Sequence, residues 1–156
     1  MLAHAIENQK VKVHFVPTFV PKQKRVLLID DDPSLEPVFD ALLHEVNTEI
    51  DIDYVTSAEA AFERLNEASG IWKSTPYDLI IADVFLDGKA TGVDVWSLCQ
   101  EAYPQMPALV MSSLPLNRIL ELIGRNSINP LFLQKPFHFA SCRRTLQEAF
   151  NTGLYT

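Results

Sequence analysis

Short apolar runs alternate with longer amphipathic segments along most of this chain. The runs at 25–30, 78–83 and 131–135 are apolar on both faces, which is typical of strands buried on both sides of a parallel sheet. Residues 50–55 instead alternate strictly, which predicts a strand with one wetter face at the edge of the sheet. With the run at 108–112, these segments predict five strands.

The segments between the strands place apolar side chains at helical spacing and are bounded by capping residues, glycine or proline. They predict helices over residues 34–46, 57–68, 93–103, 116–123 and 139–151. Asp32 is the expected N-cap of the first helix, with Pro33 at its first position, and Ser57 is the expected cap of the second. Asp51 and Asp53 are expected on a solvated strand face.

Strict alternation of strands and helices indicates one class of fold. It implies right-handed crossovers and a doubly wound α/β fold, in which a five-stranded parallel sheet is covered by helices on both faces. We assign this domain to residues 25–151. Residues 1–24 form an N-terminal extension that could be disordered, add an edge strand or grip a partner, and residues 152–156 form a short tail.

Composition narrows the function classes. The formal net charge of −7 argues against binding to bulk nucleic acid or to an anionic membrane. Cys99 and Cys142 lack a metal-ligand spacing, and the sequence has neither the pattern of a signal peptide nor an apolar stretch long enough to span a bilayer. These features predict a cytoplasmic protein with reduced thiols.

Charged side chains follow three of the buried strands directly. Asp30, Asp31 and Asp32 follow one strand, Asp83 ends another, and Lys135 ends a third. In open α/β sheets, functional groups gather outside the carboxyl ends of the strands, so these side chains are expected at one edge. Clustered carboxylates repel one another unless a cation is present. The pattern therefore predicts a divalent metal site with an anion-binding lysine beside it.

Asp83 is the candidate nucleophile, because a carboxylate can accept a phosphoryl group to form an aspartyl phosphate. Asp30 and Asp31 are placed to hold an ion together with Asp83 and a nearby backbone carbonyl, and all-oxygen ligands suit Mg²⁺ or Mn²⁺. The ion and Lys135 would neutralise charge on the transferring oxygens. Ser112 ends the fourth strand and can donate a hydrogen bond to a phosphoryl oxygen.

Each of these residues also has a plainer interpretation. Asp30 and Asp31 could form a solvated turn, and Asp83 could cap a helix. Lys135 could be an ordinary surface lysine, and Ser112 could be a turn residue. Their joint occurrence at the ends of buried strands favours the metal and phosphoryl site.

This constellation resembles the receiver domain of bacterial two-component response regulators, of the chemotaxis-regulator type, over about residues 25–150. The matching pieces are, in order, Ile29-Asp30-Asp31, Asp83, Ser112-Ser113 and Lys135-Pro136-Phe137. The resemblance implies the flavodoxin-like strand order 2-1-3-4-5. It also implies that Asp83 is the phosphoacceptor.

The resemblance further implies how metal and phosphate are held. Asp31 would be a direct Mg²⁺ ligand, and Asp30 a ligand or a water-mediated support. Phe85, two residues after the acceptor, falls where the family binds metal through a backbone carbonyl. Lys135 would be the phosphate-binding lysine.

Other positions match the family less uniformly. Ser112 and Phe132 fall where the family has its hydroxyl and aromatic switch residues, although Phe132 could equally be a plain core residue. Asp87 stands where the family usually has proline, and the loop up to Gly92 is one residue longer than usual. These departures remove no chemical group.

The expected function is that of a single-domain receiver that takes a phosphoryl group on Asp83 from a phosphohistidine, on a sensor histidine kinase or a histidine phosphotransfer protein. Such a domain catalyses its own phosphorylation and dephosphorylation and signals through contacts with an output protein, here unknown. The altered loop and the N-terminal extension support one alternative, a receiver-like adaptor that phosphate does not regulate. A phosphatase with an aspartate nucleophile usually has a second aspartate two residues later, where this chain has Phe85.

Overall fold

The computed structural model describes residues 23–69, 75–124 and 130–152, in which strands and helices alternate strictly. The strands are β1 (Lys24–Ile29), β2 (Ile50–Val55), β3 (Leu79–Asp83), β4 (Ala108–Ser112) and β5 (Leu131–Gln134). The helices are α1 (Glu36–Val46), α2 (Ala58–Ser69), α3 (Gly92–Ala102), α4 (Leu116–Ile123) and α5 (Phe139–Thr152). Every predicted strand and helix is confirmed, with its ends within two residues of the predicted ones.

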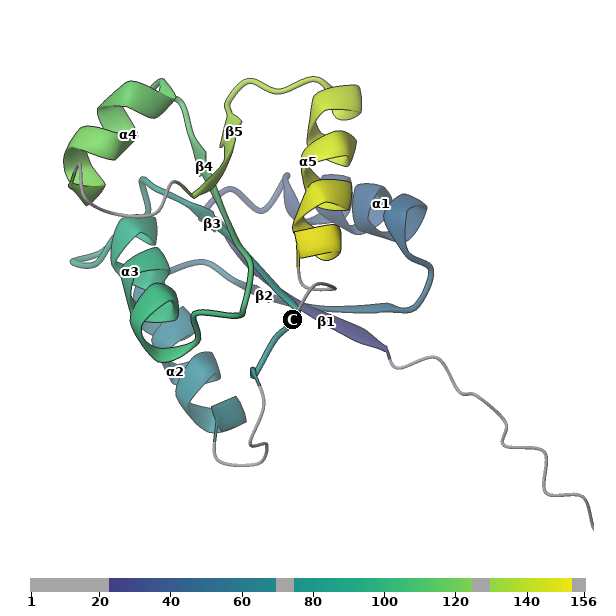
Figure 1. Ribbon diagram of the computed structural model, residues 1–156, viewed down its shortest axis with the longest axis horizontal. Coiled ribbons are helices and arrows are strands. Elements are labelled where there is room, and N and C mark those ends of the chain that lie inside the picture. Colours follow the sequence, from purple (N-terminus) through teal and green to yellow (C-terminus); the bar gives the residue numbers. More distant parts are fainter. Residues whose placement is uncertain (1–22, 70–74, 125–129, 153–156) are drawn as a thin grey trace, which may run out of the picture.

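The strands form one parallel sheet in the order β2-β1-β3-β4-β5 (Figure 1). The flavodoxin-like order that the resemblance implied is therefore confirmed. β2 lies at one edge of the sheet, as its alternating pattern predicts. β3 and β4 are buried at every residue, because helices cover both faces of these inner strands.

The helices form two layers on opposite faces of the sheet. α1 and α5 pack on one face, and α2, α3 and α4 pack on the other (Figure 1). Alternate residues of β1 belong to the two hydrophobic cores. Val26 and Leu28 face α1 and α5, whereas Leu27 and Ile29 face the other three helices. Apolar side chains thus fill both faces, and the polar groups that follow the strands are left at the carboxyl edge.

The turn from β3 into α3 brings the helix close to the end of the strand. Gly92 is buried as the first residue of α3, and a Cβ here would lie 1.9 Å from the carbonyl oxygen of Asp83. Glycine is required at this position, since any side chain would push the helix away from the strand. Thr91 and Asp94 form a reciprocal capping box that fixes the same helix start.

The two expected helix caps had different outcomes. Ser57 caps α2, because its hydroxyl accepts the backbone N–H of Ala60 at 3.2 Å. The prediction that Asp32 caps α1 is wrong, since this helix begins at Glu36. The Asp32 carboxylate instead accepts the backbone N–H and the hydroxyl of Ser34, at 2.9 and 2.7 Å. It is satisfied within its own turn, so the chain completes that turn before the helix begins.

Charged groups also meet near the amino ends of β1 and β3. We call this set the amino-edge cluster; it consists of Lys24, Arg25, Asp53, Tyr77 and Asp78. Arg25 and the Tyr77 hydroxyl both donate to Oδ2 of Asp53, at 2.9 and 2.6 Å. Lys24 donates to Asp78 at 3.1 Å. Asp53 lies on a partly solvated strand face, with its side chain 31% exposed, but its carboxylate also accepts two hydrogen bonds from partners far away in the sequence.

The ends of the chain are described only in part. Lys24, which we had assigned to the extension, is the first residue of β1. The expectations for residues 1–22 and 153–156 lie outside the described residues. Within the described ranges, no helix combines the length and apolarity that a membrane span requires.

Candidate functional site

The carboxyl edge of the sheet gathers the charged residues that follow β1, β3 and β5. β1 and β3 pair in register up to the residues just before Asp30 and Asp83, so these two follow as neighbours. One carboxylate oxygen from each of Asp30, Asp31 and Asp83 lies within 4.8 Å of the other two. We call these three residues and Lys135 the acidic edge. The structure thus brings together the four charged residues that the sequence analysis assigned to the site.

Lys135 joins the two buried carboxylates of the acidic edge. Its Nζ donates to Oδ2 of Asp30 at 2.7 Å and to Oδ2 of Asp83 at 2.6 Å. The Asp30 side chain is fully buried and that of Asp83 is 11% exposed, so both ion pairs are largely shielded from solvent. The Lys135 backbone N–H donates to the carbonyl of Ser112 at 2.7 Å, and the Lys135–Pro136 peptide bond is cis. Backbone and side-chain bonds together hold the lysine at this edge.

Backbone N–H groups orient all three carboxylates. These bonds run from Asp32 to Asp30 Oδ1 at 2.9 Å, from Phe85 to Asp83 Oδ1 at 3.2 Å, and from Asp87 to Asp31 Oδ2 at 3.3 Å. A carboxylate has about four acceptor positions, so the bonds leave oxygen lone pairs for a cation. The carboxylates are therefore fixed in direction without being saturated.

Burial sets the charge state at this edge. Desolvation raises the pKa of Asp30 above its usual value, and the hydrogen bond from Lys135 offsets this only in part. For Lys135, burial alone would lower the pKa, but the hydrogen bonds to Asp30 and Asp83 outweigh it and raise the pKa. Lys135 therefore stays protonated at neutral pH. One ammonium group faces three carboxyl groups, which leaves excess negative charge that a further cation would relieve.

The donor set fits a hard divalent cation. All three converging side chains are carboxylates, and such oxygen ligands suit Mg²⁺ or Mn²⁺. Phe85, expected to add its carbonyl, has a half-exposed side chain and a backbone tied to this edge through its N–H. Cys99 and Cys142 lie in the two cores, and burial raises the pKa of each thiol to about 12, so neither offers a thiolate ligand.

Ser112 and Phe132 lie on the same face of the sheet, on neighbouring strands. Phe132 is opposite Val110 in the register of β4 and β5, and residues two apart on a strand share a face. Ser112 is fully buried, and its Oγ accepts the N–H of Leu114 at 3.0 Å. Phe132 is partly buried and packs against the core under α2, α3 and α4. Ser112 and Phe132 therefore share one face of the sheet, two positions apart along neighbouring strands.

Two further residues, Tyr54 and Glu59, contact this region and were not predicted from the sequence. The Tyr54 hydroxyl donates to the backbone carbonyl of Asp30 at 2.6 Å, and burial together with the Asp30 carboxylate raises the pKa of this tyrosine. Glu59 accepts hydrogen bonds from the backbone of Lys89 and Ala90. Neither residue stands out locally, because Tyr54 fits an alternating strand and Glu59 an exposed helix turn. Only their tertiary partners distinguish them.

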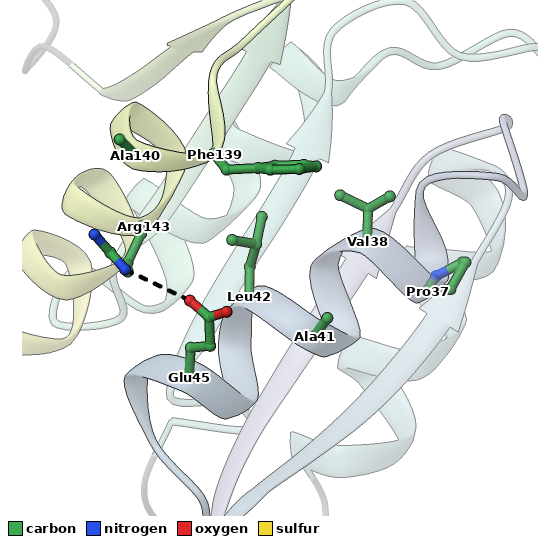
Figure 2. A pocket seen from close by; sticks show the side chains of 8 residues that line it. All are labelled: Pro37, Val38, Ala41, Leu42, Glu45, Phe139, Ala140 and Arg143. Carbon is green, nitrogen blue, oxygen red and sulfur yellow. Dashed lines mark ion pairs between the residues drawn. The ribbon is translucent and has the colours of Figure 1, made fainter.

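A separate apolar hollow lies between α1 and α5 (Figure 2). Its lining residues are Pro37, Val38, Ala41, Leu42, Glu45, Phe139, Ala140 and Arg143. Arg143 and Glu45 form an ion pair at 3.7 Å between the two helices. Mostly carbon atoms face this hollow, and it contains none of the residues of the acidic edge. We therefore keep it distinct from the candidate phosphoryl site.

Comparison with known proteins identifies structures with a similar fold. No family model matches the sequence, and no curated protein matches it. Solved structures do match: a response regulator receiver protein from Sinorhizobium medicae has a TM-score of 0.66 at 24% identity, over 83% of this chain and 96% of that chain. A CheY-like receiver domain protein from Methanospirillum hungatei has a TM-score of 0.62 at 18% identity, over 84% of this chain and 96% of that chain.

The receiver domain of NtrX from Brucella abortus is similar as well, with a TM-score of 0.63 at 17% identity, over 84% of this chain and 99% of that chain. At less than 25% identity, these three likenesses show the fold. The chain has the fold of a response regulator receiver domain. The resemblance first seen in the strand-end motifs is confirmed at that level.

Proposed function

We propose that this chain is a receiver regulated by phosphorylation, in which Asp83 accepts a phosphoryl group from a phosphohistidine with the help of Mg²⁺ or Mn²⁺. The position of Lys135 carries the proposal, because its Nζ lies 2.7 and 2.6 Å from the buried carboxylates of Asp30 and Asp83. Burying two carboxylates on one lysine, with Asp31 beside them, works against stability. Phosphoryl chemistry gives this arrangement a use that folding alone does not.

In the proposed reaction, the Asp83 carboxylate attacks phosphorus, and a P–O bond forms as the P–N bond to the donor imidazole breaks. The bonding electrons leave with the imidazole, which takes up a proton. Lys135 would exchange its hydrogen bond with Asp83 for one to a phosphoryl oxygen and so stabilise the charge that develops there. Asp30, Asp31, Asp83 and the Phe85 carbonyl would hold the divalent ion, which neutralises phosphoryl oxygens when bound.

The proposed donor is a sensor histidine kinase or a histidine phosphotransfer protein, and the output is a protein contact that changes with phosphorylation. Ser112 and Phe132 are the proposed switch. The buried Ser112 hydroxyl now accepts the Leu114 N–H and would turn to donate to a phosphoryl oxygen, leaving room for the ring. In Ser112→Ala, phosphorylation should persist, while the change in hydrogen exchange at α4 should weaken. A normal response at α4 would argue against the coupling.

Intact mass after incubation with acetyl phosphate and MgCl₂ tests the phosphoacceptor. The parent protein should gain one phosphoryl group, Asp83→Asn should gain none, and the neighbouring control Asp87→Asn should still be labelled. Labelling that persists in Asp83→Asn would rule out this assignment. A parent that stays unlabelled, by acetyl phosphate and by a phosphorylated histidine phosphotransfer protein alike, would instead favour the adaptor function.

A further inference from the structure

The β3–α3 loop, residues 84–91, joins the proposed phosphoacceptor to α3. The receiver-domain resemblance would place a proline, which stiffens a loop, where this loop has Asp87. Its two ends are tied together, because Gly92 donates to the carbonyl of Val84 at 3.1 Å. The middle of the loop therefore needs a support of its own.

Glu59, in the first turn of α2, supplies that support. Its Oε1 accepts the backbone N–H groups of Lys89 and Ala90, at 3.1 and 3.2 Å. Two consecutive amides that converge on one carboxylate oxygen form a small anion-binding concavity. Backbone hydrogen bonds, from its own residue and from the loop, hold the pKa of Glu59 below its usual value. The side chain is therefore ionised, and the contact persists, at neutral pH.

Gly88 makes room for this contact. Its φ is +137°, a conformation that side chains disfavour, and a Cβ at this position would lie 2.9 Å from Oε2 of Glu59. The carboxylate thus packs directly against the glycine backbone. The positive φ favours glycine at this position, and the missing side chain lets the Glu59 carboxylate approach the loop backbone.

The supported segment adjoins the acidic edge. Asp87, one residue before Gly88, donates its N–H to Oδ2 of Asp31 at 3.3 Å. We propose that Glu59 is a positioning residue: by anchoring the β3–α3 loop to α2, it holds the Asp31 carboxylate and the Phe85 carbonyl in the arrangement that binds a divalent cation. This inference rests on the proposed function, because it assumes that the acidic edge binds Mg²⁺.

Mg²⁺ affinity, measured by titrating MgCl₂ and following backbone amide shifts, tests the positioning role. Glu59→Ala should weaken binding about ten-fold, which is typical when a group that orients metal ligands is lost. Glu59→Gln keeps an oxygen acceptor for both loop amides and should retain most of the affinity. Glu63→Ala, an exposed change one turn further along α2, should leave it unchanged. Equal affinities in the parent and Glu59→Ala would overturn the proposal.

Amide hydrogen exchange in metal-free protein tests the loop independently of the metal. Exchange at Lys89 and Ala90 should be about ten-fold faster in Glu59→Ala and in Gly88→Ala, but not in Glu63→Ala, because the first two changes open the same hydrogen bonds. Unchanged exchange in Glu59→Ala would overturn the positioning role of Glu59 but not the proposed metal site. A parent that binds no Mg²⁺ would overturn both this inference and the proposed metal site, whatever the exchange shows.

Discussion

The amino-edge cluster and the acidic edge contain similar charged side chains, but these side chains have different roles. The amino-edge cluster pairs two cations with two carboxylates, at N···O distances of 3.1 and 2.9 Å. The acidic edge sets one cation, Lys135, against three carboxylates. A balanced network needs nothing beyond the fold, whereas an unbalanced one stores negative charge that only a further cation relieves. The imbalance, rather than the presence of charge, separates a candidate site from a structural network.

Burial sharpens this difference. The paired side chains of the amino-edge cluster are 20–38% exposed, so solvent screens their charges. At the acidic edge, the Asp30 side chain is fully buried and Lys135 is 21% exposed. Excess charge there acts through a lower dielectric and weighs more heavily on stability. The edge that is worse for folding is therefore the acidic edge, which follows β1, β3 and β5. The expectation that residues 131–135 are buried on both sides is wrong, because β5 is the other edge strand of the sheet and only Leu133 in it is buried.

Removing the cation at each edge should give the largest contrast. Lys135→Ala leaves two shielded carboxylates without a cationic partner. It should lower the free energy of unfolding by about 3 kcal/mol, because breaking a buried pair leaves charge uncompensated. Lys24→Ala breaks a partly exposed pair and should lower the free energy of unfolding by less than about 1 kcal/mol. Urea unfolding in EDTA measures both. Similar losses would mean that the two edges do not differ in the way their charges suggest.

The next largest effect should come from adding Mg²⁺, which should stabilise the protein through the acidic edge. At about 100 times its dissociation constant, Mg²⁺ should raise the unfolding free energy of the parent by about 2.7 kcal/mol, because it binds only the folded chain. Asp31→Ala should lose most of this gain, whereas Asp32→Ala should keep it, since the Asp32 carboxylate is engaged by Ser34. Equal losses in the two variants would show that the wrong pair was chosen from the acidic triplet.

The fold and the acidic edge could be predicted because both depend on local pattern. Apolar runs at strand spacing set the sheet, and the residues directly after the strands must meet at its carboxyl edge. The errors concern partners distant in sequence or competing local bonds. The partners of Asp53 were not predicted, because Arg25 and Tyr77 reach it only after the strands pair. Asp32 looked like a helix cap, but its carboxylate is bound to Ser34. The spacing of apolar and polar residues does not show which partner Asp53 or Asp32 will bind.

Neutralising one carboxylate at each edge should change stability in opposite directions. In EDTA, Asp31→Asn should stabilise the fold by about 0.5 kcal/mol, because it relieves like-charge repulsion and keeps an oxygen for the Asp87 N–H. Asp53→Asn should destabilise it by about 1 kcal/mol, because Arg25 and Tyr77 lose an anionic acceptor. Chemical unfolding of both variants is the measurement. Two changes of the same sign would contradict the contrast between the edges.

The last contrast is a pH dependence of stability that Tyr77 contributes within the amino-edge cluster. Burial, and then the hydrogen bond to the Asp53 carboxylate, raise the pKa of Tyr77 above its ordinary value of 10.0. Above about pH 10, the unfolded chain loses this proton while the folded chain keeps it, so the unfolded state binds fewer protons and stability falls as pH rises. Tyr77→Phe removes this contribution, so its disadvantage against the parent should shrink by about 1 kcal/mol from about pH 9 to about pH 11.

The raised pKa of Lys135 also makes the protein less stable as pH rises through this range. That loss is the same in the parent and in Tyr77→Phe, so the difference in stability between them isolates Tyr77. Tyr103→Phe is the matched control, and a difference from the parent that stays constant across this range in Tyr77→Phe would refute the assignment.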